Sequence, residues 1–85
     1  MRVDYDPEAD AAYVALGSRA VARVQEVSDV CILDLAHDGS VVGVELLSVF
    51  GFAGAALSDL VARGILDRQT TQTILGDLRV QAKAA

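Results

Sequence analysis

The apolar residues of this chain change their spacing near residue 50, and this change constrains the fold more than any other feature. Up to Leu47, apolar residues alternate with polar ones or form short runs between turn residues, a pattern typical of strands. Further along, Leu57, Leu60 and Val61 recur at helical spacing. The sequence therefore predicts an α+β fold in which the strands come first and the helices follow.

Strand signals in residues 1–50 predict a four-stranded antiparallel β-sheet arranged as a meander. The four segments span residues 2–6, 11–16, 21–35 and 41–47. Ser28-Asp29 interrupts the third segment and marks either a bulge or a short break, after which residues 30–35 continue or restart the strand. Asp38-Gly39 lies between the third and fourth segments and is the best hairpin signal in the chain.

The C-terminal part of the chain predicts one or two α-helices. Gly64 is a stop signal for the first helix, and Asp67 is placed to cap the second. The apolar stripe of the second helix consists of Thr71, Ile74, Leu75, Leu78 and Ala82. We interpret the chain as a single domain, with residues 1–50 as the sheet core and residues 51–85 as its helical extension.

The predicted hairpin over residues 30–47 is largely apolar on both faces, whereas a sheet with one solvated face alternates more clearly. Hydrophobic residues make up 53% of the 85 residues, a high share for a small chain whose surface is mostly polar. The single cysteine and single histidine leave no disulfide or zinc site to stabilise the core. We therefore expect a homo-oligomer, a dimer or larger. The interface candidates are Val41, Leu47, Phe50 and Phe52.

Charge is distributed unevenly along the chain. Residues 1–50 hold nine acidic groups against three arginines, a net charge of −6, and residues 51–85 hold three against four basic groups, a net charge of +1. An acidic sheet repels phosphate, so nucleic-acid binding is disfavoured. Nucleic-acid binding is therefore a minor hypothesis, in which the contact is made by the basic residues Arg63, Arg68, Arg79 and Lys83. The sequence has no leader-like or membrane-spanning apolar segment, which predicts a cytoplasmic protein without membrane contact.

Acidic residues form the only other candidate site. If Asp6, Asp10, Asp34 and Glu45 converged at one end of the sheet, they would suit a divalent metal or a small ligand at an oligomer interface, with weak hydrolytic activity. The competing interpretation is structural and is the one we prefer. It makes Asp6 a turn residue and Asp10 a cap, and it pairs Asp34 and Glu45 with arginines. Glu45 alone would be either a general acid–base or an ion-pair partner across a subunit interface.

Two sequence blocks resemble a known family. Residues 5–13 read Tyr-Asp-x-x-Ala-Asp-x-x-Tyr, and residues 34–46 read Asp-Leu-x-x-Asp-Gly-x-Val-Val-Gly-x-Glu-Leu. Both blocks, in this order, resemble a family of short bacterial proteins catalogued as a domain of unknown function. The resemblance implies a small β-rich fold and no established activity. Some such small proteins are suspected partners of toxin-like proteins, which suggests an antitoxin-like role.

The leading hypothesis is a non-enzymatic, self-associating protein-interaction module that uses no cofactor. It depends on the apolar excess, the two apolar sheet faces and the lack of a recognisable catalytic motif. In this hypothesis the C-terminal helix is a second surface on which another protein docks.

Overall fold

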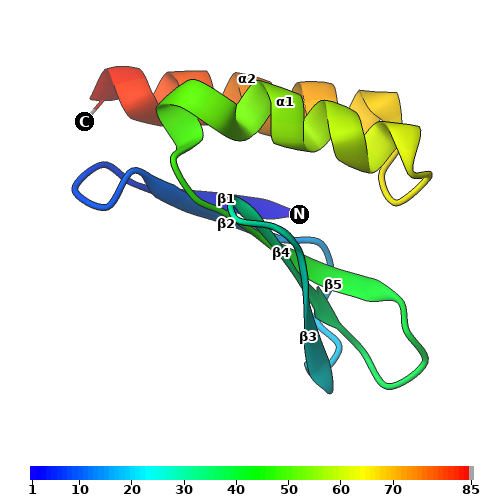
Figure 1. The fold of residues 1–85 in the computed structure, drawn as a ribbon. Coiled ribbons are helices and arrows are strands. Elements are labelled where there is room, and N and C mark those ends of the chain that lie inside the picture. The colour runs from blue at the N-terminus through cyan, green and yellow to red at the C-terminus, as the bar shows by residue number, and fades with distance from the viewer. Residues whose placement is uncertain (85) are drawn as a thin grey trace.

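Five strands followed by two helices make up the chain in a computed structural model, which describes residues 1–84. The elements are β1 (Arg2–Asp6), β2 (Ala11–Ala15), β3 (Arg23–Ser28), β4 (Cys31–Leu35), β5 (Val41–Leu46), α1 (Val49–Ala62) and α2 (Arg68–Ala84). The strands form one antiparallel sheet, and both helices lie antiparallel to each other over one face of it (Figure 1). The predicted α+β class is confirmed, with both predicted helices present.

The predicted count of four strands is wrong, because the third segment is two strands. β3 and β4 pair antiparallel, and the chain reverses direction between Ser28 and Cys31. The Val30 amide donates a hydrogen bond to the Ser28 side-chain oxygen at 3.3 Å, a local contact that favours a turn over an extended chain. The break at Ser28-Asp29 was therefore placed correctly, but it is a complete hairpin turn, with a register shift between Glu26 and Ser28 next to it.

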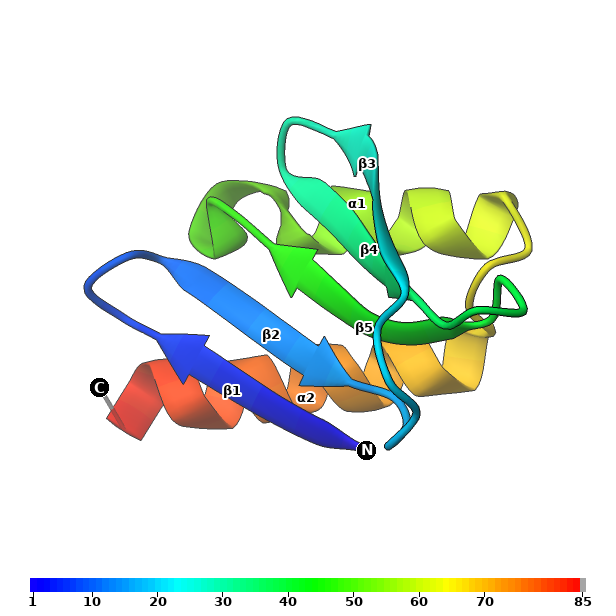
Figure 2. The ribbon, with the colours of Figure 1, turned by 90° about the horizontal axis from the view of Figure 1, so that it is seen from below.

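The strand order is also not a meander. The order β1-β2-β5-β4-β3 places β2 beside β5, and residues 16–22 carry the chain from β2 to the far edge, where β3 begins (Figure 2). β2, the last strand of the first family-like block, thus lies beside β5, the last strand of the second block. β1 and β3 are left as the two edges.

The core lies between the sheet and the helices. Alternate strand residues point into it as predicted, and they meet the apolar stripes of both helices. The fully buried large side chains are Val14, Cys31, Leu33, Val44, Leu46, Leu57, Leu60 and Ile74. Val41, one of the interface candidates, pairs with Leu35 through a register shift and packs against the core.

Helix ends follow the predicted signals in part. Gly64 adopts φ +75° just after α1, and the Thr70 amide donates to Asp67 Oδ1 at 2.6 Å at the start of α2. α1 begins at Val49, earlier than the apolar spacing indicated. Neither helix within residues 1–84 combines the length and the hydropathy needed to cross a bilayer.

Candidate functional site

Asp10 connects the first turn of the sheet to the start of α1. Its carboxylate accepts the Phe50 amide at 3.1 and 3.2 Å, and its carbonyl oxygen accepts the Val49 amide at 3.0 Å. The helix lacks a cap of its own, because Ser48 has φ 50° and makes no side-chain capping bond. Tyr5 donates its hydroxyl to Asp10 Oδ1 at 2.8 Å, and this bond to a carboxylate raises the pKa of Tyr5. Asp10 is therefore the cap of α1, supplied from another part of the chain.

A second contact crosses the outer face of the sheet. The Tyr13 hydroxyl on β2 donates to Asp34 Oδ2 on β4 at 2.7 Å, and the tyrosine passes over Gly43 on β5 to reach it. A Cβ at Gly43 would overlap the Tyr13 hydroxyl. The hydrogen bond to Asp34 is the main cause that raises the pKa of Tyr13 to about 12. The hydroxyl is thus held protonated, which suits a structural contact and not a catalytic phenolate.

Three of the four carboxylates predicted as a metal site, Asp6, Asp10 and Asp34, accept hydrogen bonds from different partners. Asp6 Oδ1 accepts the amides of Glu8 and Ala9 in the turn after β1, while Asp10 and Asp34 hold the contacts described above. Glu45 is exposed opposite Tyr13, in a shallow hollow of about 240 Å³ that also contacts Asp4 and Asp6. Within residues 1–84, no group of three or more His, Cys, Asp or Glu side chains is placed to hold a metal ion.

Arginine partners for Asp34 and Glu45 are not found either. The ion pairs among residues 1–84 join Arg2 to Asp4, Arg19 to Asp38 and Arg63 to Asp59. Asp38 also accepts the Ser40 amide and hydroxyl, and Arg19 together with these bonds holds the pKa of the Asp38 carboxyl far below its ordinary value. The turn role predicted for Asp38 is confirmed, whereas Asp34 bonds to a tyrosine and not to an arginine.

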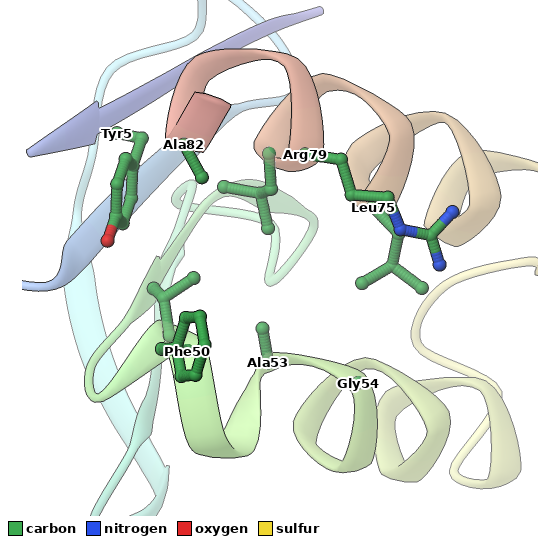
Figure 3. A pocket seen from close by; sticks show the side chains of 9 residues that line it. Tyr5, Phe50, Ala53, Gly54, Leu75, Arg79 and Ala82 are labelled. Atoms are coloured by element: carbon green, nitrogen blue, oxygen red, sulfur yellow. The ribbon is translucent and has the colours of Figure 1, made fainter. Parts of the chain in front are cut away.

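An apolar groove lies between the two helices, beside Tyr5 of the edge strand β1 (Figure 3). We call it the α1–α2 groove, and its volume is about 270 Å³. It is lined by Tyr5, Val49, Phe50, Ala53, Gly54, Leu75, Leu78, Arg79 and Ala82. A second hollow of about 170 Å³ shares Gly54 and Leu75 with it and continues along the helices toward Val61 and Arg68. The small residues of α1 leave this space open.

Phe50 stands at one end of the groove beside the Tyr5 ring (Figure 3). Its side chain is 94% exposed, and Phe52, on the same turn of α1, is 54% exposed. Among residues 1–84, the charged side chains in the linings of the two hollows are Arg79 in the groove and Arg68 in the second hollow, and no carboxylate lines either one. The groove therefore combines an apolar floor with a positively charged wall.

The predicted interface residues are spread over different environments. Phe50 is exposed at the groove, Phe52 is exposed outside its lining, Leu47 is half-buried after β5, and Val41 packs against the core. Sequence reasoning missed Gly54 of α1 and Arg79 of α2, which also line the groove. Leu75, Leu78 and Ala82 belong to the apolar stripe predicted for the second helix, and they form the groove wall on α2.

Comparison with known proteins adds a family without an assigned activity. Residues 2–49 match the family described as Protein of unknown function (DUF2283). No curated protein and no solved structure matches the chain. The matched region contains all five strands and ends at the first residue of α1, so most of the groove lies outside it.

Proposed function

Because the chain belongs to the DUF2283 family, whose function is unknown, we propose its function from the site itself. In this proposal the protein is a non-enzymatic, self-associating protein-interaction module, and its α1–α2 groove binds an acidic, apolar segment of a partner protein. The main support is Phe50, which is 94% exposed at the end of an apolar groove of about 270 Å³. Exposed aromatic residues beside apolar hollows commonly mark protein-binding surfaces.

The size of the groove favours side chains over a whole small molecule. Its volume of about 270 Å³, followed by a hollow of about 170 Å³, compares with ~300–1,000 Å³ for pockets that enclose drug-sized ligands. Two consecutive hollows along a helix pair suit two bulky side chains of one peptide segment. Covering Phe50 alone would contribute ~1.5–3 kcal/mol to binding, because a buried phenylalanine is worth about that much.

The charge of the groove defines the rest of the partner. Arg79 of α2 lines the groove and Arg68 of α2 lines the second hollow, and none of the described residues in either lining is a carboxylate. Acidic residues flanking the apolar anchors of the partner would complement these arginines and fix its orientation. An antitoxin-like role, in which the partner is a toxin-like protein, is one instance of this function that only the family resemblance suggests.

Selection from random peptides displayed on phage tests the proposal with the wild-type protein as bait. We expect the enriched peptides to combine a bulky apolar residue with Asp or Glu. Gly54→Leu fills the groove, and because a Cβ at Gly54 contacts no other atom, the fold accommodates it. This substitution should weaken the selected peptides by at least about tenfold, equivalent to ~1.4 kcal/mol.

Gly51→Leu is the matched control, since Gly51 is on the same helix, equally open and not part of the groove lining. It should leave peptide affinity unchanged. Arg79→Glu should shift the selected peptides from acidic to basic residues. The proposal is wrong if the enriched peptides bind the wild type and Gly54→Leu equally well, or if selection yields no binding peptide.

A further inference from the structure

The two edge strands of the sheet, β1 and β3, differ in whether another part of the chain covers their free backbone groups. At β1, the Tyr5 amide donates to Gln81 Oε1 at 2.8 Å, and Gln81 Nε2 donates to the Val3 carbonyl oxygen at 2.6 Å. The side-chain amide of one α2 residue thus makes the pair of hydrogen bonds that a neighbouring strand would make. Edges covered in this way are protected from pairing with another chain.

The β3 edge has no such cover. Within the described residues 1–84, β3 pairs with β4 alone, and every residue of β3 except Val27 is exposed, with Val24 at 63%. In Figure 1 this strand lies at the end of the sheet that projects away from the helices. β3 therefore presents open backbone groups together with an uncovered apolar side chain.

The charges of β3 suit pairing with a second copy of the same strand. Each molecule carries a net charge of −5, so two copies repel unless the contact is locally neutral. β3 contains one cation, Arg23, and one anion, Glu26. Antiparallel two-fold registers centred on Val24 or on Gln25 place no like charges opposite each other. In β1, a register centred on Asp4 would place two aspartates face to face.

We propose that β3 pairs antiparallel with β3 of a second copy, so that one continuous sheet with five strands from each copy crosses a two-fold axis. This names the partner and the surface for the self-association in the proposed function, and it does not depend on the groove. The two outer edges of the joined sheet are both β1, which Gln81 covers. The assembly therefore stops at two copies.

Gln25→Lys tests this pairing through the solution mass, measured by light scattering on size exclusion from micromolar to millimolar concentration. The lysine faces Arg23 of the second copy in the register centred on Val24, and it faces another lysine in the register centred on Gln25. Either register opposes like charges, so we expect the wild type to be a dimer and the variant to dissociate at least about ten times more readily. Gln25 is exposed, so circular dichroism should report an unchanged fold.

Val80→Lys is the matched control, because it makes the same change in net charge at a different place. Val80 is a residue of α2 that is 69% exposed and far from β3 in the sequence. It should remain a dimer. A monomeric wild type, or a dimer that withstands Gln25→Lys, would overturn the pairing.

The dimer and the groove can be tested separately. Gln25→Lys should bind the groove-selected peptides with unchanged affinity, and Gly54→Leu should keep the mass of a dimer. Failure of one proposal is therefore distinguishable from failure of the other.

Discussion

Gly43 is the residue at which the outer face of the sheet is most tightly specified. The tyrosine that crosses it comes from the first family-like block, and the aspartate that receives the hydrogen bond begins the second block. Tyr13, Gly43 and Asp34 therefore form one contact across three strands. Packing accounts for their presence in the sequence blocks.

Gly43→Ala should destabilise the protein by ~1–3 kcal/mol, because the added methyl group displaces the Tyr13 ring and breaks its hydrogen bond. Urea denaturation monitored by circular dichroism measures the change. Gly76→Ala is the control, since a Cβ there contacts nothing and alanine favours a helix by up to ~1 kcal/mol. If Gly43→Ala costs as much in a Tyr13→Ala background as in the wild type, the displaced ring is not the cause.

The raised pKa of Tyr13, about 12, predicts a loss of stability at alkaline pH. The folded state favours the protonated phenol, so this contribution is complete below pH ~10 and is lost as the pH rises through ~12. Tyr13→Phe removes the titrating group. The wild type should exceed this variant in stability by ~1 kcal/mol near neutral pH, and the difference should shrink between pH ~10 and ~12. A constant difference across that range would contradict the prediction.

Single residues were predicted well where their role is local and poorly where it depends on topology. The turn role of Asp6 and the cap role of Asp67 follow from neighbours within three residues. The Tyr13–Asp34 bond requires two strands that sit on either side of β5, and nothing in the spacing of residues 13 and 34 indicates that placement. The metal hypothesis for the acidic residues had the same weakness, because their convergence depended on the strand order.

At the scale of elements, α2 does more than cover the core. It forms one wall of the α1–α2 groove, and through Gln81 it also protects the β1 edge. The sequence indicated the helix and the apolar stripe that lines the groove, but not the contact of Gln81 with β1, because Gln81 lies off that stripe. The extra strand was missed because the turn between β3 and β4 contains neither glycine nor proline.

Gln81→Ala should expose the β1 edge. We expect a loss of ~1–3 kcal/mol in the free energy of unfolding, because the Tyr5 amide and the Val3 carbonyl lose their partner. Light scattering at high protein concentration should also detect species larger than the dimer, because the second edge can then pair. Gln72→Ala, an exposed position of the same helix, should do neither. Unchanged stability and mass in Gln81→Ala would remove the edge-protecting role.

The whole molecule has an acidic sheet and a helical layer whose groove is positively charged. In the proposed dimer both helical layers lie on the same face of the joined sheet, so the two grooves open toward the same side. A partner with two binding segments would then gain affinity from the second contact without any new interaction. This arrangement follows from a two-fold axis perpendicular to the sheet.

Salt should strengthen the dimer. Each copy carries a net charge of −5, and the β3 contact contains as many cations as anions, so long-range repulsion is the main electrostatic effect. Raising the ionic strength from ~0.01 M to ~0.1 M shortens the screening length from ~30 Å to ~10 Å. The dissociation constant from analytical ultracentrifugation should fall over this range. A rise would indicate that ion pairs hold the dimer together.

The capping of α1 by Asp10 also bears on how such chains can diverge. Asp10 lies within the matched region. The amide that donates to its carboxylate belongs to Phe50, which is the second residue of α1 and the first residue beyond the matched region. That contact involves only main-chain atoms of the helix, so it places no demand on which side chain follows. The same β-sheet can therefore begin helices of unrelated sequence at the same point. The side chains of such a helix, and the surface that they form, can change without a change in the sheet.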